Sequence, residues 1–197
     1  MIDLTKLEMK VILKIVKSPE REYNANSLSA VLGVTSMGVL KILKRLEREY
    51  VLKSKKIGRM VLYRVNIKDA YARKYVSFVL SREAFFSDAK VRRWIEELKK
   101  IQSADMIILY GSVLIKSEPH DIDVLFLTEQ SKFSSLKKEV DFMNKMNIKK
   151  IHPLYQNFQD IIDNIKKRHP PLLNAIKGIV VHGEEKFIEV YNESRKE

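Results

Sequence analysis

The feature that most constrains the fold is a pair of short apolar runs, MIILY at residues 106–110 and VLFL at residues 124–127. The first run ends at a Gly-Ser pair, and the second follows an Asp-Ile-Asp sequence. Uninterrupted apolar runs of this length are typical of strands that are covered on both faces of a sheet. Together they predict two strands of a buried sheet, with polar groups gathered where the first ends and the second begins.

The polar groups at this point are Gly111, Ser112, Asp121 and Asp123. Residues two apart in a strand point to the same side, so both carboxylates are expected to face the Gly-Ser turn. Paired carboxylates repel each other unless a cation lies between them, and Mg²⁺ suits that place and can bridge to nucleotide phosphates. Glycine lets backbone N–H groups approach a phosphate, and serine adds a hydroxyl. The alternative is a surface turn followed by a strand with carboxylates at its edge.

The order of apolar strand, Gly-Ser, spacer, Asp-Ile-Asp and apolar strand resembles the nucleotidyltransferase superfamily of DNA polymerase beta, over roughly residues 88–190. The resemblance implies that Gly111 and Ser112 hold a nucleoside triphosphate. It also implies that Asp121 and Asp123 are the catalytic residues and ligate Mg²⁺. A helix at 132–146 and a strand at 150–155 are expected to follow.

The chain departs from that family in its third strand, where active members place a third carboxylate. Residues 149–155 read KKIHPLY and contain no acid, and His152 in this stretch could act as a base. The spacer also has Val113, Leu114 and Lys116 where many members have an arginine. Enzymatic activity is therefore left open: the unit either transfers nucleotides, binds metal and nucleotide without strong catalysis, or is structural.

Positive charge is concentrated near the N-terminus. The 197 residues contain 37 Lys+Arg and 25 Asp+Glu, a net charge of +12. Residues 1–68 hold 15 bases and 6 acids, and residues 69–197 hold 22 and 19. Charge confined to one segment favours a polyanionic partner, with nucleic acid as the leading candidate.

The basic segment also has an ordered pattern of elements. An amphipathic helix ends near Ser18-Pro19, a short helix at 27–32 follows Asn26 as its N-cap, and Thr35 caps a longer helix. Residues 52–56 and 60–65 are β-prone runs separated by Ile-Gly-Arg, which predicts a hairpin. On residues 27–65, this order resembles a winged helix-turn-helix domain of the kind found in many prokaryotic regulators.

That resemblance implies binding to double-stranded DNA, with the capped helix in the major groove and basic side chains on phosphates. Ser36 and Lys41 are left for reading bases, because Met37, Gly38 and Leu40 occupy the other base-reading positions. The alternative is a winged helix that mediates protein contacts. The residues expected to contact DNA are Ser36, Lys41, Lys44, Arg45, Arg48, Lys53, Lys55, Lys56 and Arg59.

The predicted fold is α+β: a winged helix domain at 1–68, a helical connector at 69–87 and an α/β nucleotidyltransferase-like domain with a small mixed sheet at 88–197. Within the helical stretch at 67–102, Ser87 is expected to cap the second helix. Aromatic residues in this stretch suit either a connector packed on both flanking domains or a homodimer interface.

Several classes are excluded. The absence of cysteine rules out a disulfide scaffold, a thiol nucleophile and a Cys-based zinc site. No signal peptide and no apolar stretch of ~18 residues is found, so a soluble, cytoplasmic protein without a membrane partner is expected.

The sequence therefore predicts a DNA-binding transcriptional regulator whose second domain binds metal and nucleotide. The alternative is an active Mg²⁺-dependent nucleotidyltransferase that transfers NMP from NTP to a hydroxyl of a protein, nucleic acid or small molecule.

Overall fold

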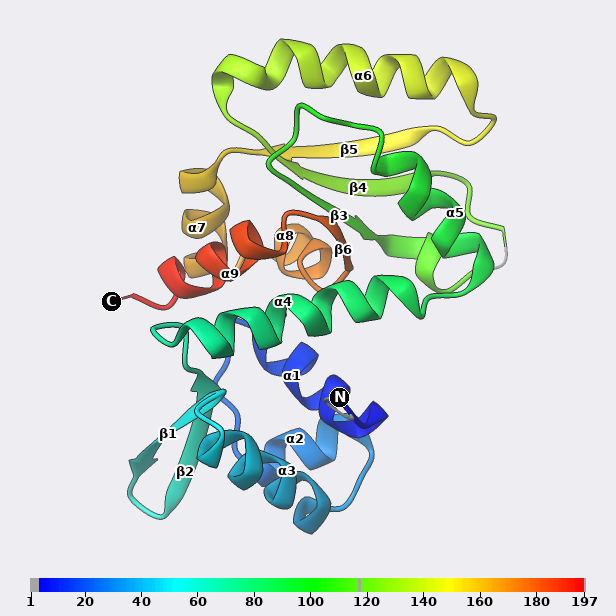
Figure 1. Ribbon diagram of the computed structural model, residues 1–197. Coiled ribbons are helices and arrows are strands. Elements are labelled where there is room, and N and C mark those ends of the chain that lie inside the picture. The colour runs from blue at the N-terminus through cyan, green and yellow to red at the C-terminus, as the bar shows by residue number, and fades with distance from the viewer. Residues whose placement is uncertain (1–3, 117, 197) are drawn as a thin grey trace. The chain divides into compact units, whose positions relative to one another are not determined.

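The computed structural model describes residues 4–116 and 118–196 (Figure 1). Contacts divide the chain into an N-terminal unit, Met1–Val79, and a C-terminal unit, Leu80–Glu197. The division falls inside helix α4 (Ala70–Phe85), within the stretch that the sequence suggests as a connector. The fold is α+β, as the sequence predicts.

The N-terminal unit contains three helices and a hairpin, followed by the first part of α4. They are α1 (Lys6–Val16), α2 (Ala25–Leu32), α3 (Ser36–Arg48), β1 (Leu52–Ile57) and β2 (Met60–Val65). Their apolar faces meet in a core whose fully buried members include Ile12, Leu28, Leu43 and Leu46. This order and packing are those of a helix-turn-helix followed by a wing.

Local capping sets where the helices of this unit begin. The Thr35 hydroxyl accepts a hydrogen bond from the Gly38 N–H at 3.3 Å, which confirms the predicted cap of α3. The predicted cap of α2 at Asn26 is wrong. Asn24 accepts from the Ser27 N–H at 2.8 Å, and the Ser27 hydroxyl accepts from the Asn24 N–H at 3.0 Å. This reciprocal capping box starts α2 earlier than predicted.

The hairpin turns at Gly58, whose φ of +58° favours glycine. Its register pairs Ile57 with Met60 and, towards the helices, Lys53 with Arg64. The wing is therefore a regular antiparallel ribbon, and residues directly opposite each other on it are close neighbours.

The C-terminal unit is built around a four-stranded sheet in the order β5-β4-β3-β6 (Figure 1). β3 pairs antiparallel with β4 and β6, and β4 pairs parallel with β5, so the sheet is mixed, as predicted. In chain order the elements are α5 (Ala89–Leu98), β3 (Met106–Tyr110), η1 (Gly111–Leu114), β4 (Ile122–Leu127), η2 (Gln130–Lys132), α6 (Phe133–Met146), β5 (Ile151–Gln156), α7 (Phe158–Lys166), α8 (Pro170–Ala175), β6 (Ile179–His182) and α9 (Glu184–Glu193).

Helices cover both faces of this sheet. Ile107, Leu109, Val124 and Phe126 share a core with side chains of α5 and α6. The alternate residues of β3 and β4 are also buried, on the face where α8 and α9 contact β3. Burial on both faces explains why the two strands read as uninterrupted apolar runs.

The start of α5 corrects a second predicted cap. The Asp88 carboxylate, not the Ser87 hydroxyl, accepts the hydrogen bond from the Val91 N–H, at 2.9 Å. The Ser87 hydroxyl donates to the Ala84 carbonyl at the end of α4, at 2.7 Å. Serine and aspartate are both good N-cap residues. Here the Ser87 hydroxyl is bonded to the Ala84 carbonyl, and Asp88 caps α5 instead.

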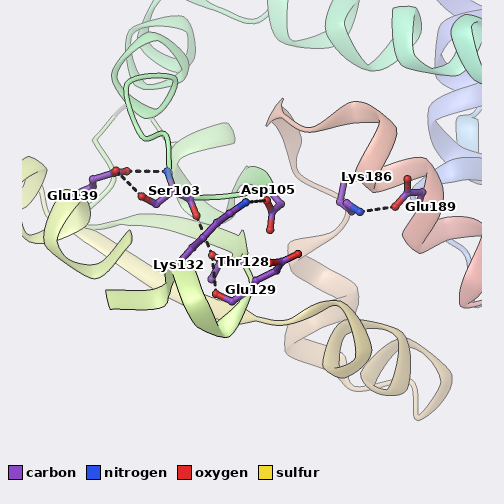
Figure 2. A network of polar contacts seen from close by, with 8 residues as sticks. All are labelled: Ser103, Asp105, Thr128, Glu129, Lys132, Glu139, Lys186 and Glu189. Atoms are coloured by element: carbon purple, nitrogen blue, oxygen red, sulfur yellow. Dashed lines mark hydrogen bonds and ion pairs between the residues drawn. The ribbon is translucent and has the colours of Figure 1, made fainter. Parts of the chain in front are cut away.

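A polar network ties α6 to the segment that leads into β3 (Figure 2). Glu139 accepts hydrogen bonds from the Gln102 and Ser103 N–H groups at 2.9 and 3.2 Å, and from the Ser103 hydroxyl at 2.7 Å. The Thr128 hydroxyl donates to the Ser103 carbonyl at 2.9 Å. These bonds hold α6 against the C-terminal end of α5.

Across residues 4–116 and 118–196, every helix is too short or too polar to cross a bilayer.

Candidate nucleic-acid interface and strand-end site

Helix α3 separates its apolar residues from its basic ones. Val39, Leu43 and Leu46 are fully buried, while Ser36, Lys41, Lys44 and Arg48 of the predicted DNA contacts are exposed. The spacing of 3.6 residues per turn produces this separation, since buried and exposed sets occupy different faces. Met37 is also exposed, at 62%, on the first turn of the helix.

The wing continues the basic surface. Lys55, Lys56 and Arg59 are exposed, and Lys53 is half-buried at the base of the hairpin. Lys53 lies directly opposite Arg64, which the sequence analysis did not single out. Burial, and then the charges of Arg64 and Lys68, lower the pKa of Lys53 below its ordinary value. Like charges that face each other across a ribbon are destabilising without an anion nearby.

Arg45 differs from the other predicted contacts because it has an internal partner. Its guanidinium forms an ion pair with the carboxylate of Glu8, which is 2% exposed. The hydrogen bond to Glu8 raises the pKa of Arg45. The hydroxyl of Tyr75 donates to the same carboxylate, so Glu8 joins α1, α3 and α4.

Tyr75 is nearly inaccessible, at 3% exposure. Burial first, and then its hydrogen bond to Glu8, raise the pKa of Tyr75 far above its ordinary value of 10.0. A buried carboxylate that has two donors is a fixed anchor. The Glu8–Arg45–Tyr75 cluster therefore fixes the orientation of α3 relative to α1 and α4.

In the C-terminal unit, three polar side chains lie in a row at one end of the sheet, on neighbouring strands. Tyr110 is opposite Asp123 on β3 and β4, and Asp123 is beside His152 on β4 and β5. His152 Nδ1 lies 3.4 Å from Asp123 Oδ1, close enough for an ion pair when the imidazole is protonated. The His152 side chain is 77% exposed and that of Asp123 is 28% exposed. We call this row the strand-end site.

Gly111 closes one side of the strand-end site. Its φ is +77°, and a Cβ atom there would collide with Asp123 Oδ2. The backbone of Gly111 thus lies directly against the Asp123 carboxylate, which a residue with a side chain could not allow. Ser112 follows in the short helix η1, and its carbonyl accepts from the Lys116 N–H at 2.8 Å.

Asp121 lies outside the regular strand. It occupies an exposed bend immediately before Ile122, the first residue of β4. Strand alternation therefore does not orient Asp121, and a shared direction for Asp121 and Asp123 stays a prediction.

Within the strand-end site, Tyr110 interacts electrostatically with Asp123. Burial, and then the negative charge of Asp123, raise the pKa of Tyr110 above its ordinary value. The residue stands at the end of an apolar strand, directly before Gly111, and this position was the signal that could have identified it. The position of His152 beside Asp123 follows from the parallel pairing of β4 and β5, which the sequence alone does not reveal.

The strand-end site does not fit the set of ligands of a two-metal nucleotidyltransferase. In the part of the chain that the structure describes, no group of three or more His, Cys, Asp or Glu residues is arranged to hold a metal ion. The residue beside Asp123 on the neighbouring strand is an imidazole, and Mg²⁺ prefers oxygen ligands. A Mg²⁺ ion here would depend on phosphate and water oxygens for most of its coordination.

No protein-family model and no curated protein matches the sequence. Two solved structures, both mutants of ZitR from Lactococcus lactis, match at 18% identity with TM-scores of 0.30 and 0.32. The matched regions span 50% and 51% of this chain, and 73% and 76% of the two ZitR chains. Scores this low carry no argument about fold or function.

Proposed function

We propose that this protein is a DNA-binding transcriptional regulator whose N-terminal unit binds duplex DNA through α3 and the wing. The observation that carries the proposal is the set of exposed lysine and arginine side chains on these two elements, with the apolar residues of α3 buried on its other face. DNA backbone phosphates attract such a set without regard to sequence, and α3 has the dimensions to enter the major groove.

Two details of the N-terminal unit support this proposal. Lys53 faces Arg64 on the wing, an arrangement that a bound phosphate would relieve. Arg45 is held by Glu8, and we infer that it positions α3 and does not primarily bind phosphate. Arg64 therefore joins the residues proposed to bind phosphate.

Base reading by α3 is proposed to be modest. Ser36 offers a hydroxyl, and exposed Met37 offers apolar contact of the kind that suits a thymine methyl group. The rest of the affinity would come from phosphates and from DNA shape.

The test is the salt dependence of binding between the full chain and a labelled duplex, measured by fluorescence anisotropy. K55E/K56E should weaken binding and reduce the slope of log K against log salt by about 0.9 for each phosphate that is no longer neutralised. The matched control is K6E/K10E, which changes the same charge on α1 of the same unit and should have a smaller effect on the slope. Equal weakening in the two variants would refute a specific face, and affinity independent of salt would refute binding through phosphates.

The homodimer remains part of the proposal. Exposed Tyr71, Phe78 and Phe85 recur at seven-residue intervals along α4, the spacing of one helix face. Sedimentation equilibrium of the full chain and of its Phe85→Ser variant tests this point, and a monomer at all concentrations would remove it.

A second candidate function is nucleotide binding or transfer by the C-terminal unit, favoured by the contact between the Gly111 backbone and the Asp123 carboxylate. Gly111 and Ser112 would bind the phosphates, and Asp121 and Asp123 would hold the Mg²⁺ that a nucleotide brings. Bound Mg²⁺ would supply charge neutralisation on the phosphates. Because the strand-end site lacks the family's third carboxylate, we derive no transfer step.

This second candidate is tested with Mg²⁺ or Mn²⁺, labelled NTPs and the full chain, comparing the wild type with D121A/D123A. Label transfer that the double variant loses would establish the enzyme. Nucleotide binding without transfer, measured by calorimetry and lost in the same variant, would establish a sensor. Neither signal with any of the four NTPs would leave the C-terminal unit without a nucleotide function.

A further inference from the structure

The C-terminal unit has an open groove between α5 and α6, lined by residues other than those of the strand-end site. One hollow of about 600 Å³ lies along the two helices, and a second of about 450 Å³ continues it. The two hollows share Met146 and Asn147. We call the pair the α5–α6 groove.

Apolar side chains line the α5–α6 groove and reach solvent at its edge. Ile101 and Met143 are buried in it, whereas Phe142 and Met146 are 63% and 71% exposed. Ile148 in the second hollow is 97% exposed. Exposed aromatic and methionine side chains around a concave surface are typical of protein interaction sites, because they adapt to apolar partners.

Basic side chains surround this apolar surface. Lys90 and Arg93 belong to α5, Lys138 to α6, and Lys149 precedes β5. The Lys149 ammonium donates to the Pro119 carbonyl at 2.8 Å, and that of Lys90 to the Lys116 carbonyl. A neutral carbonyl acceptor holds each of these ammonium groups in place without neutralising its positive charge.

The two acids that line the α5–α6 groove are already engaged. Glu97 forms an ion pair with Lys100 at 2.8 Å. Glu139 accepts three hydrogen bonds from the Gln102–Ser103 segment, as Figure 2 shows for Ser103. The groove therefore presents an apolar floor and a rim of net positive charge.

We propose that the α5–α6 groove binds an acidic amphipathic helix of a partner protein. Such a helix would place apolar side chains, recurring every three to four residues, against Phe142, Met143 and Met146. Its flanking carboxylates would face Lys90, Arg93, Lys138 and Lys149. This proposal is independent of DNA binding and of nucleotide binding.

Charge and polarity disfavour the other occupants. A second copy of this chain would bring a net charge of +12 to a rim that is itself basic. Nucleic acid would match the rim, but its phosphates gain nothing from an apolar floor. An occupant that is both acidic and apolar satisfies both parts of the surface.

The probe is a synthetic peptide of about five helical turns, with leucines along one face, glutamates on the other and no tryptophan. Trp94 lines the second hollow and is the chain's one tryptophan, so its emission reports occupancy directly. Full-length protein is titrated with the peptide, and both Trp94 emission and peptide anisotropy are followed. We expect saturable binding with Kd in the micromolar range, near −8 kcal/mol at about 1 μM.

Three variants sharpen the test. R93E/K138E should weaken binding about tenfold, whereas R92E/K137E, which reverses the adjacent charges outside the lining, should change it less than about twofold. Phe142→Ser should also weaken binding about tenfold, because it removes an exposed apolar contact without entering the core. Circular dichroism of each variant shows whether it is folded.

Four outcomes would overturn the proposal. They are no saturable binding of the acidic peptide, equal binding of a sequence-scrambled peptide, equal binding of a lysine-for-glutamate peptide, and equal weakening by the two double variants. Self-association abolished by Phe142→Ser would assign the groove to a second copy instead. None of these outcomes depends on whether the chain binds DNA.

Discussion

The two candidate regions use polar residues in opposite ways. The proposed DNA-binding face spreads exposed lysine and arginine side chains over α3 and the wing, and the Glu8–Arg45–Tyr75 cluster joins α3 to α1 and α4 through the buried Glu8 carboxylate. The strand-end site uses few polar groups, placed by three neighbouring strands, and one of them, Asp123, lies against the Gly111 backbone.

This difference predicts different sensitivities to substitution. Removing one exposed lysine or arginine from the proposed face should change DNA affinity little, because the neighbouring basic side chains would still bind phosphates. A change beneath the face or beside the strands affects stability, because buried groups have no solvent to replace a missing partner. The sole tryptophan, Trp94, lies in the C-terminal unit, so its fluorescence reports that unit while circular dichroism reports both.

The largest effect is expected for Arg45→Met. Removing this guanidinium leaves the Glu8 carboxylate buried without its cation, which should cost about 2–4 kcal/mol of unfolding free energy. In urea unfolding, the transition seen by circular dichroism should move to lower urea, and the transition of Trp94 fluorescence should not. The matched control is Arg48→Met on the exposed side of α3, which should change DNA affinity more than stability. Equal stability of the two variants would show that the cluster is not an anchor.

The next effect is expected for Gly111→Ala. The added Cβ would collide with the Asp123 carboxylate, and the alanine would have to keep a positive φ. Together these effects should lower the unfolding free energy of the C-terminal unit by about 2–3 kcal/mol. Gly58→Ala is the control, because it also has a positive φ but open space around it, and should cost about 1 kcal/mol in the N-terminal unit. The unfolding transition seen by Trp94 fluorescence should shift in Gly111→Ala and stay unchanged in Gly58→Ala. A smaller cost for Gly111→Ala than for Gly58→Ala would contradict the contact.

An effect of intermediate size concerns alkaline pH. The pKa of Tyr75 is raised in the folded state, so the stability it contributes is fully present below the unfolded pKa of about 10 and is lost as pH rises above it. Below pH 10, Tyr75 should add nothing to the pH dependence of the free energy of unfolding. Above it, the decline should be steeper in the wild type than in Tyr75→Phe, by up to about 1.4 kcal/mol per pH unit. Tyr50→Phe, at an exposed position, should leave the slope unchanged.

The smallest effect on stability is expected for Lys53→Met. Removing the charge opposite Arg64 should stabilise the N-terminal unit by less than about 0.5 kcal/mol near neutral pH. Because the folded-state pKa of Lys53 is lowered, the wild type should lose this disadvantage as pH rises towards 10.5. The same variant should bind DNA more weakly, so stability and affinity change in opposite directions. A destabilised variant at neutral pH would contradict the repulsion.

Local features of this chain were predictable from sequence. The apolar run at 106–110, the Thr35 cap and the hairpin around Gly58 depend on neighbours within a few residues, and all three are confirmed. The wrong caps at Asn26 and Ser87 show where local reasoning fails. In each case another good capping residue within one or two positions took the hydrogen bond.

Tertiary structure alone decided which distant side chains meet. Arg45 carries the same charge as its exposed neighbours, and only the packing of α1 against α3 gives it Glu8, 37 residues away. His152 lies beside Asp123, 29 residues earlier, because β4 and β5 pair in parallel. Periodicity and capping are set by bonds and contacts along the chain. Ion pairs and cross-strand neighbours are set by topology, which one sequence does not express residue by residue.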